Sequence, residues 1–162
     1  DKNIRTKLYF YKDPLQKRIC ENVQAQLRKH LGVKVHLQQM EWKSYIQKVN
    51  TDPPGFFRLG WMSLYPDPSF LAGIYTSDSH FNTTGWQNKN YDKLVLQAKQ
   101  ETRRSQRITL YKKAMRILTE KDVAVFPLFT GARQYMVSEH VRDYPLNPLN
   151  RLIFKDSHKL KR

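Results

Sequence analysis

Hydrophobic and polar residues alternate in strand-type and helix-type patterns through the first forty residues. The run LYFYK at 7–11 has the aromatic content of a strand. Apolar residues then recur every four positions from Leu15 to Leu31, which predicts one face of a helix. Apolar and polar residues alternate over 33–37, as in a half-buried strand. This strand–helix–strand order predicts two parallel strands joined by a right-handed crossover.

The predicted helix carries a start and a stop signal. Asp13 suits the N-cap, and Pro14 suits the first helical position because an amide hydrogen there would have no partner. Gly32 suits the left-handed conformation in which many helices end. Cys20, the one cysteine, falls inside this helix, and we expect it to be a small core residue.

Similar helix-type and strand-type patterns continue to residue 60, and an irregular segment follows. The segment EWKSYIQKV at 41–49 predicts a second helix, and 56–60 predict a third strand after a proline-rich turn. Residues 63–84 have no long periodicity and are rich in Pro, Ser, Asp and Gly. They predict an irregular loop with a short helix near 70–75.

The second half predicts two helices followed by two strands. We expect Asn90 and Ser105 to cap the helices. The run VAVFPLF at 123–129 has the content of a buried strand, and 134–138 are expected to pair with it. The tail from His140 onward is expected to be irregular.

The predicted fold class is α/β, with a mixed sheet of about five strands and helices on both faces. Residues 33–40, 56–60 and 123–129 are expected to share this sheet. Val33, Val35 and Leu37 are expected to be mostly buried within it.

Charge adds one alternative function. The chain carries 29 Lys and Arg against 14 Asp and Glu, a net charge of +15, which favours phosphates, anionic lipids or acidic partners. The cations are dispersed in twos and threes, with a small cluster only in the tail from Lys159 to Arg162. We find no nucleic-acid motif. A basic α/β module that binds nucleic acid or an anionic surface remains the alternative.

Catalytic and cofactor signatures are missing from the sequence. The five histidines lack metal-ligand spacing, and Cys20 has no partner cysteine. There is no GxGxxG, phosphate-binding loop or GxSxG motif. We therefore predict that the protein is not an enzyme and uses no cofactor and no metal.

The segment RLGWMSLYPDPSFL, 58–71, stands out because an apolar run ends at a Gly-Trp pair and breaks into a proline-punctuated loop. By itself this pattern fits either a ligand-binding wall or a well-packed corner. Together with the preceding LGVKVHLQQMEWKSYI, it resembles the C-terminal lobe of bacterial extracytoplasmic solute-binding proteins of the oligopeptide and dipeptide class, family 5 of the ABC importers. The later segments YDKLVLQAKQETRRSQRITLYKKAMRIL, VAVFPLF and DYPLNPLNRLIF resemble the same lobe in the same order.

The resemblance implies a two-lobed, exported periplasmic protein that closes on its ligand and delivers it to a membrane permease. Residues 1–162 would form its single C-terminal ligand-binding lobe, one lobe of a periplasmic-binding-protein type II fold. The signal peptide and the larger N-terminal lobe would lie outside this fragment. The implied ligand is a peptide or a related solute, and the implied partners include no nucleic acid.

The resemblance also implies a ligand-binding set: Arg58, Gly60, Trp61, Met62, Ser63, Leu64, Tyr65 and Gln16. Arg58 would face a ligand carboxylate, although a salt bridge at a strand end is the simpler interpretation. Gly60 would allow close approach of a ligand backbone, and Trp61 matches a cleft tryptophan. We expect Trp61 and Tyr65 to be more exposed than large aromatic side chains usually are.

Two positions depart from the family pattern. Leu64 stands where many oligopeptide binders have an aspartate that pairs with the ligand's free amino group, and Gln16 stands where some members have a histidine. The ligand is then blocked, modified or not a peptide, or else Asp67 or the missing lobe supplies the anion. The alternative interpretation is that Leu64 packs beneath Tyr65.

Overall fold

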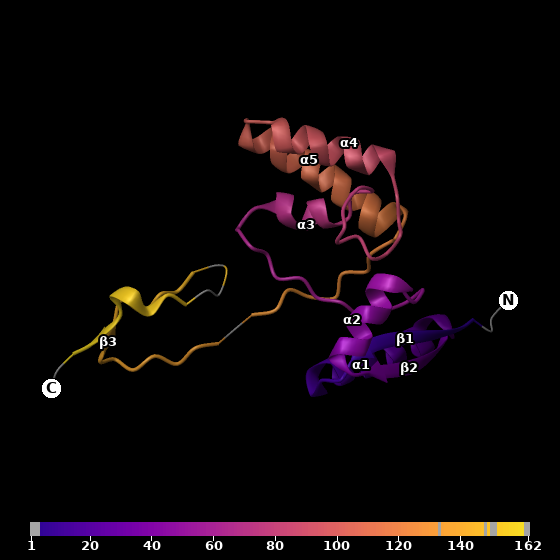
Figure 1. The fold of residues 1–162 in the computed structure, drawn as a ribbon, viewed down its shortest axis with the longest axis horizontal. Coiled ribbons are helices and arrows are strands. Elements are labelled where there is room, and N and C mark those ends of the chain that lie inside the picture. Colours follow the sequence, from indigo (N-terminus) through magenta and orange to yellow (C-terminus); the bar gives the residue numbers. More distant parts are fainter. Residues whose placement is uncertain (1–3, 133, 148, 150–151, 161–162) are drawn as a thin grey trace. The chain divides into compact units, whose positions relative to one another are not determined.

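The computed structural model describes residues 4–132, 134–147, 149 and 152–160 (Figure 1). The chain divides into two compact units. The first comprises the residues up to Trp61 together with His80–Trp86. The second comprises Met62–Ser79 and the residues from Gln87 onward.

The first unit is built on the predicted strand–helix–strand motif. Strand β1 (Arg5–Tyr11) pairs in parallel with β2 (Lys34–Met40), and the connecting helix α1 (Pro14–Leu31) packs on both. Helix α2 (Trp42–Thr51) follows and contacts β1. The parallel pair and both helices confirm the sequence prediction.

Both cap predictions for α1 are confirmed. The Asp13 carboxylate accepts a 2.9 Å hydrogen bond from the Gln16 amide, and Pro14 opens the helix. Gly32 ends the helix with φ of 69°, a left-handed conformation that costs little without a Cβ atom. These signals act within four residues, which is why the sequence alone locates them.

The buried face of α1 is rotated from the predicted one. Leu15 and Leu31 are exposed, whereas Gln16 and Cys20 are buried. Steps of four residues advance by about 400° around a helix, so five such residues drift over roughly 160° and cannot all face one core. Cys20 packs with Leu8, Phe10 and Val35 in the core, as predicted for the cysteine. Of the predicted β2 core residues, Val35 is buried, while Val33 and Leu37 are half-buried.

The third strand predicted at 56–60 is reduced to an isolated parallel bridge between Phe57 and Tyr9. The Tyr9 amide donates to the Phe56 carbonyl at 3.1 Å, and the Arg58 amide donates to the Tyr9 carbonyl at 2.8 Å. The Arg58 carbonyl, which would continue the ladder, instead accepts from the hydroxyl of Tyr45. The side-chain bond thus takes the acceptor that a longer strand would need.

The second unit contains three helices in sequence: α3 (Pro68–Ile74), α4 (Lys89–Gln100) and α5 (Arg104–Arg116). One turn of π-helix, η1 (Ile117–Lys121), extends α5. The short helix predicted near 70–75 and the two longer helices are confirmed.

Neither predicted cap of the longer helices is correct. The side chain of Asn88 caps α4, accepting from the amides of Asn90 and Tyr91 at 3.0 and 3.1 Å. Ser105 lies inside α5, which begins after Arg103. Asn88 and Asn90 are both competent caps, and local sequence could not choose between them.

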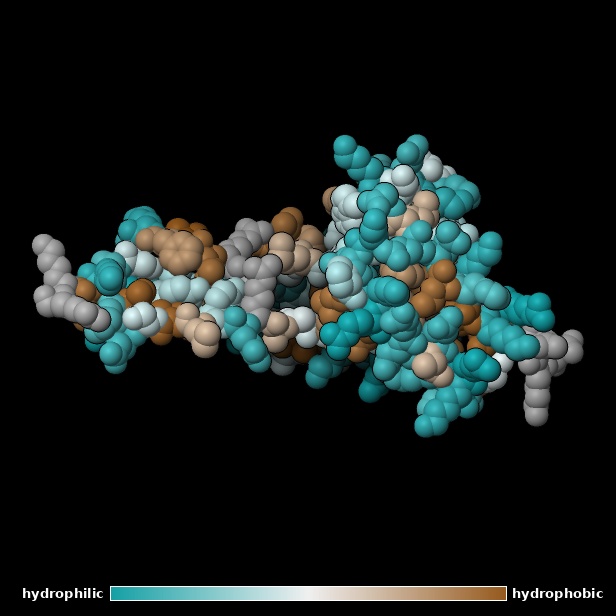
Figure 2. Space-filling view, turned by 90° about the horizontal axis from the view of Figure 1, so that it is seen from below, coloured by the Kyte–Doolittle hydropathy of each residue, from teal (hydrophilic) through white to brown (hydrophobic). Residues whose placement is uncertain are grey.

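The strand predicted at 123–129 is absent, and so is its pairing with 134–138. Val123 leaves the helical region with φ of 49°, and Phe126 and Phe129 are 63% and 59% exposed. Figure 2 shows hydrophobic side chains, in brown, at several places on the surface of the molecule. Among the described residues no strand pairs with 123–129, and Pro127 lacks an amide donor. An apolar run becomes a strand only when a neighbour takes its backbone hydrogen bonds.

The tail from His140 is more ordered than predicted. Strand β3 (Val141–Arg142) pairs antiparallel with β4 (His158–Lys159), and a short 3₁₀ turn, η2 (Phe154–Asp156), lies between them in sequence.

The described fold is therefore α/β, as predicted, but with two two-stranded sheets. The prediction of one mixed sheet of about five strands is wrong. No helix in the described residues has the length and apolarity needed to cross a membrane.

Candidate functional site

Arg58 lies at the carboxyl-end edge of the first unit's parallel strands. It directly follows Phe57, which pairs with Tyr9 two residues before β1 ends. Helix α1 begins three residues after the same strand. Ligands of open parallel sheets bind outside this edge, where the loops and helix N-termini gather. This placement supports the first unit as a candidate binding surface.

The backbone of Arg58 is anchored by α2. The Tyr45 hydroxyl donates a 2.6 Å hydrogen bond to the Arg58 carbonyl, and the Tyr45 side chain is fully buried. Burial raises the pKa of Tyr45 above its ordinary value, so the phenol keeps the proton that it donates. Tyr11 packs edge-on against Trp42 at 4.9 Å between ring centres and contacts Tyr45 at 5.9 Å. The guanidinium therefore projects from a fixed point of the backbone.

Gly60 makes room for the side chain of Arg58. A Cβ atom on Gly60 would come within 3.3 Å of Arg58 Nη1. The guanidinium thus lies close to Gly60, and a Cβ atom there would require it to shift by a few tenths of an ångström. Gly60 was predicted to let a ligand backbone approach closely. In the structure, the Arg58 side chain lies next to the position that a Cβ atom of residue 60 would take.

Gln16 supplies an unused acceptor in the same unit. It lies in the first turn of α1 and is 8% exposed, and among the described residues no donor reaches its Oε1 atom. Cys20 lies four residues, about one turn, after Gln16 on α1 and is also buried. Burial raises the pKa of its thiol to about 11. The positive charge of Arg58 opposes part of this rise. A buried amide oxygen without a partner is costly, so a ligand donor would be favoured there.

Trp61 is partly exposed, as predicted. Its side chain is 37% exposed and meets Phe81 edge-on, with 5.7 Å between ring centres. Phe81 belongs to the segment His80–Trp86, in which Asn82 Nδ2 donates to the Trp86 carbonyl at 2.8 Å. Sequence reasoning missed Phe81 because it lies in a stretch without periodicity.

The remaining predicted residues, Met62 to Tyr65, begin the second unit. Leu64 and Tyr65 are 55% and 45% exposed, so the exposure predicted for Tyr65 is confirmed. The Ser63 hydroxyl donates to the Tyr65 carbonyl at 2.5 Å, and the Tyr65 ring meets Phe70 edge-on at 5.7 Å. With half of its surface in solvent, Leu64 is not a core residue.

Asp67, the alternative anion for a ligand amine, already has a cationic partner. Its Oδ1 atom lies 2.5 Å from Arg107 Nη2 and 2.9 Å from the Ser69 amide. The hydrogen bond from Arg107, followed by that from Ser69, lowers the pKa of Asp67 well below its usual range. Its charge is thus compensated within the second unit, which weakens Asp67 as a receptor for a ligand amine.

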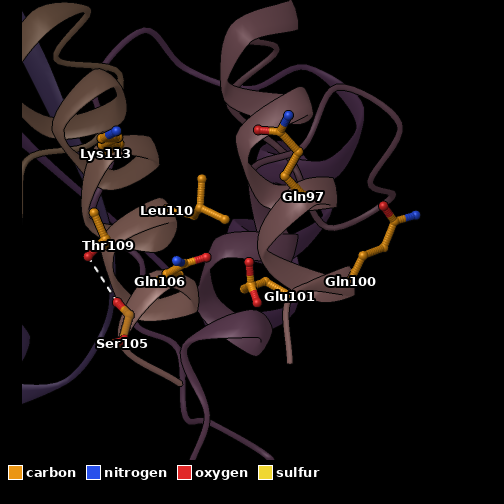
Figure 3. A pocket seen from close by; sticks show the side chains of 8 residues that line it. All are labelled: Gln97, Gln100, Glu101, Ser105, Gln106, Thr109, Leu110 and Lys113. Atoms are coloured by element: carbon orange, nitrogen blue, oxygen red, sulfur yellow. Dashed lines mark hydrogen bonds between the residues drawn. The ribbon is translucent and has the colours of Figure 1, made fainter. Parts of the chain in front are cut away.

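A polar groove lies between α4 and α5 (Figure 3). It is lined by Gln97, Gln100, Glu101, Ser105, Gln106, Thr109, Leu110 and Lys113. None of the predicted ligand residues lines it, and its one carboxylate, Glu101, is paired with Arg103 at 3.2 Å. In the part of the chain that the structure describes, no three His, Cys, Asp or Glu residues gather as metal ligands would.

The structure thus groups the predicted residues by unit. Gln16, Arg58, Gly60 and Trp61 belong to the first, and Met62 to Tyr65 belong to the second. Tyr45 and Phe81, which support Arg58 and Trp61, were not predicted as site residues. The sequence signal for Tyr45 was only its place within the predicted helix at 41–49, and such a position does not distinguish a site residue from a core residue.

Comparison with known proteins gives consistent matches. Residues 1–83 match the family described as "Bacterial extracellular solute-binding proteins, family 5 Middle". The chain is 28% identical over 155 residues to the oligopeptide-binding protein OppA of Bacillus subtilis, covering 95% of the chain and 28% of that protein. It is 28% identical over 154 residues to the probable deoxycholate-binding periplasmic protein YgiS of Escherichia coli, covering 94% of the chain and 29% of that protein.

The fold matches as well. The solved structure of the Escherichia coli murein tripeptide binding protein MppA superposes with a TM-score of 0.81 at 28% identity, over 98% of this chain and 31% of that one. The chain therefore has the fold of the corresponding part of a periplasmic peptide-binding protein. It spans less than a third of the length of each of these relatives.

Proposed function

The chain belongs to the bacterial extracellular solute-binding proteins of family 5, and from this premise we propose that residues 1–162 form the C-terminal ligand-binding lobe of the substrate-binding component of an ABC importer. The lobe is part of an exported two-lobed protein that acts in the periplasm. This protein delivers its solute to a membrane permease and catalyses no reaction. Its ligand is a peptide or a related solute.

One observation carries this proposal. Arg58 and the partnerless Oε1 of Gln16 both belong to the first unit, at or after the carboxyl end of β1. Arg58 offers a planar cationic donor from a backbone fixed by Tyr45. Gln16 offers an acceptor that nothing in the described chain satisfies. A donor and an acceptor of this kind suit a ligand that carries a carboxylate next to an N–H group, such as the last residue of a peptide.

The amino end of the ligand is treated differently. Leu64 has no charge, and Asp67 is already paired with Arg107. We propose that this lobe selects for a ligand carboxylate and not for a free ammonium group. The relative named as a probable deoxycholate binder agrees with this, because deoxycholate has a carboxylate and no amine. Because other relatives are named as oligopeptide-binding and murein tripeptide-binding proteins, a peptide is the first ligand to test.

Exposed aromatic residues support a surface that a ligand and a second lobe would cover. Trp61 and Tyr65 are both more than a third exposed. Contiguous exposed apolar surface generally marks an interaction site, and Trp61 lies against the 61% exposed Phe81 within the first unit. In a closing cleft each wall supplies part of the affinity, so the isolated lobe should bind weakly.

Calorimetric titration tests the proposal in the complete two-lobed protein. The probes are the tripeptide Ala-Phe-Ala, its N-acetylated form and its C-terminal amide. We expect amidation to weaken binding at least tenfold and acetylation to weaken it less than threefold, on the scale of one charge-assisted hydrogen bond. The lobe alone should bind none of them measurably. Equal losses on amidation and acetylation would contradict the assigned carboxylate preference.

Binding of nucleic acid or an anionic surface remains the second candidate because of the net charge of +15. Raising the salt concentration from 50 to 200 mM separates the two. Phosphate-driven affinity falls steeply with salt, by about 10³-fold or more for six or more phosphate contacts, whereas recognition in a cleft changes far less.

A further inference from the structure

The exposed loop Met62–Tyr65 is not free to sample many conformations, because its last residue is closed into a tight turn. The Tyr65 carbonyl accepts from the Asp67 amide at 2.9 Å and from the Ser63 hydroxyl at 2.5 Å. The Tyr65 hydroxyl accepts from Ser69 at 3.2 Å. These bonds fix the loop relative to the start of α3, and so the orientation of the loop depends on what holds Asp67.

Asp67 is held by one carboxylate oxygen with two donors. Oδ1 accepts from the Ser69 amide at 2.9 Å, which caps α3, and from Arg107 Nη2 at 2.5 Å. The two side chains are 28% and 27% exposed, so their pair is more shielded from water than most surface ion pairs. Arg107 lies forty residues away in sequence, on α5.

Arg107 is itself supported by the helix that carries it. Its guanidinium lies over the Tyr111 ring, 5.3 Å from the ring centre, one turn along α5. Tyr111 is buried, and α5 packs along α4. The arginine therefore presents its donor from a fixed platform and not from a mobile surface chain.

The other end of α3 is fixed independently. The buried Tyr91 hydroxyl of α4 donates to the Ala72 carbonyl at 2.7 Å. Beyond the helix, the Ser77 hydroxyl and amide donate to the two oxygens of Asp92 at 2.6 and 2.9 Å. Because these bonds do not involve Arg107, loss of the arginine should release the start of α3 and leave its end in place.

We propose that Arg107 is a positioning residue that, through Asp67, sets the conformation of the loop Met62–Tyr65 for ligand binding. The loop's contact with ligand rests on the proposed function. The positioning itself rests only on the contacts within the second unit.

Hydrogen–deuterium exchange of this chain tests the positioning. In Arg107→Ala we expect the amides of 63–70 to exchange at least about tenfold faster, and those of 91–98 to be unchanged. Arg107→Lys should restore part of the protection, because it keeps the charge and loses the planar fork. Arg103→Ala is the matched control, since it removes an exposed arginine just before α5 whose ion pair is with Glu101 and not with Asp67. Unchanged exchange at 63–70 in Arg107→Ala would overturn the inference.

Titration of the complete protein with Ala-Phe-Ala tests the consequence. We expect Kd to rise at least about fivefold in Arg107→Ala, less in Arg107→Lys, and not at all in Arg103→Ala. Faster exchange with an unchanged Kd would overturn the role in binding. A wild-type protein that binds no probe would contradict the proposed function instead, and the exchange result would still decide whether Arg107 positions the loop.

Discussion

The hydroxyl of Tyr45 donates a 2.6 Å hydrogen bond to the carbonyl oxygen of Arg58, the residue that follows the bridge between Phe57 and β1. Tyr45→Phe should therefore leave a half-buried carbonyl without its donor. We expect the free energy of unfolding to fall by about 1–2 kcal/mol, the scale of one lost buried hydrogen bond. Urea denaturation of this chain, followed by circular dichroism, measures it. Tyr9→Phe is the control, since its hydroxyl makes no hydrogen bond within the described residues. An equal loss in both variants would contradict the assignment.

Arg58→Ala should weaken a carboxylate ligand in the complete protein. Removing the charged donor should cost about 1.5–3 kcal/mol, or roughly ten- to 150-fold in Kd. The C-terminal amide of Ala-Phe-Ala should lose much less, because it has no carboxylate to pair with. If Arg58 serves only as a salt bridge at a strand end, the two ligands will lose affinity equally.

Leu64→Asp should change the preference for the amino end of the ligand. The new carboxylate restores an anion at a 55% exposed position. We expect Ala-Phe-Ala with a free amino group to gain affinity relative to its N-acetylated form, and Leu64→Asn to show no such gain. An unchanged ratio of the two Kd values would mean that Leu64 does not face the amino end.

Cys20 should resist alkylation in the folded chain. The thiol is fully buried, and burial raises its pKa to about 11, so about one molecule in a thousand carries the reactive thiolate at pH 8. We expect iodoacetamide to label it only in urea, as measured by mass spectrometry. Rapid labelling of the native chain at pH 8 would contradict its place in the core.

Asp67 should contribute a stability that depends on pH. Its pKa is lowered in the folded chain, chiefly by the hydrogen bond from Arg107, so the unfolded chain binds a proton first as the pH falls. The contribution is complete above the unfolded pKa of about 3.9 and is lost as the pH falls below it. Asp67→Asn should be less stable than wild type by about 1 kcal/mol at pH 6, and the difference should shrink toward pH 2. A difference that is constant with pH would exclude the ion pair as its source.

Local signals in the sequence determined most of the first unit. Asp13, Pro14 and Gly32 fixed both ends of α1, because caps are hydrogen bonds and backbone preferences that act within four residues. Alternation over 33–37 located β2, and the strand–helix–strand order gave the parallel pairing. The segment 58–65 was singled out by its residues and by the family resemblance, and the exposure expected for Trp61 and Tyr65 followed from that resemblance.

Tertiary structure alone decided the features that depend on partners distant in sequence. The run 123–129 has strand composition, yet no described strand supplies its hydrogen bonds, so it forms no strand and most of its residues are exposed. Phe81 meets Trp61, and Arg107 meets Asp67, across separations that no period or motif encodes. The hydroxyl of Tyr45 likewise took the Arg58 carbonyl from the third strand. Composition states what a segment can form, and only the neighbours brought by folding determine which of its hydrogen bonds and apolar contacts are made.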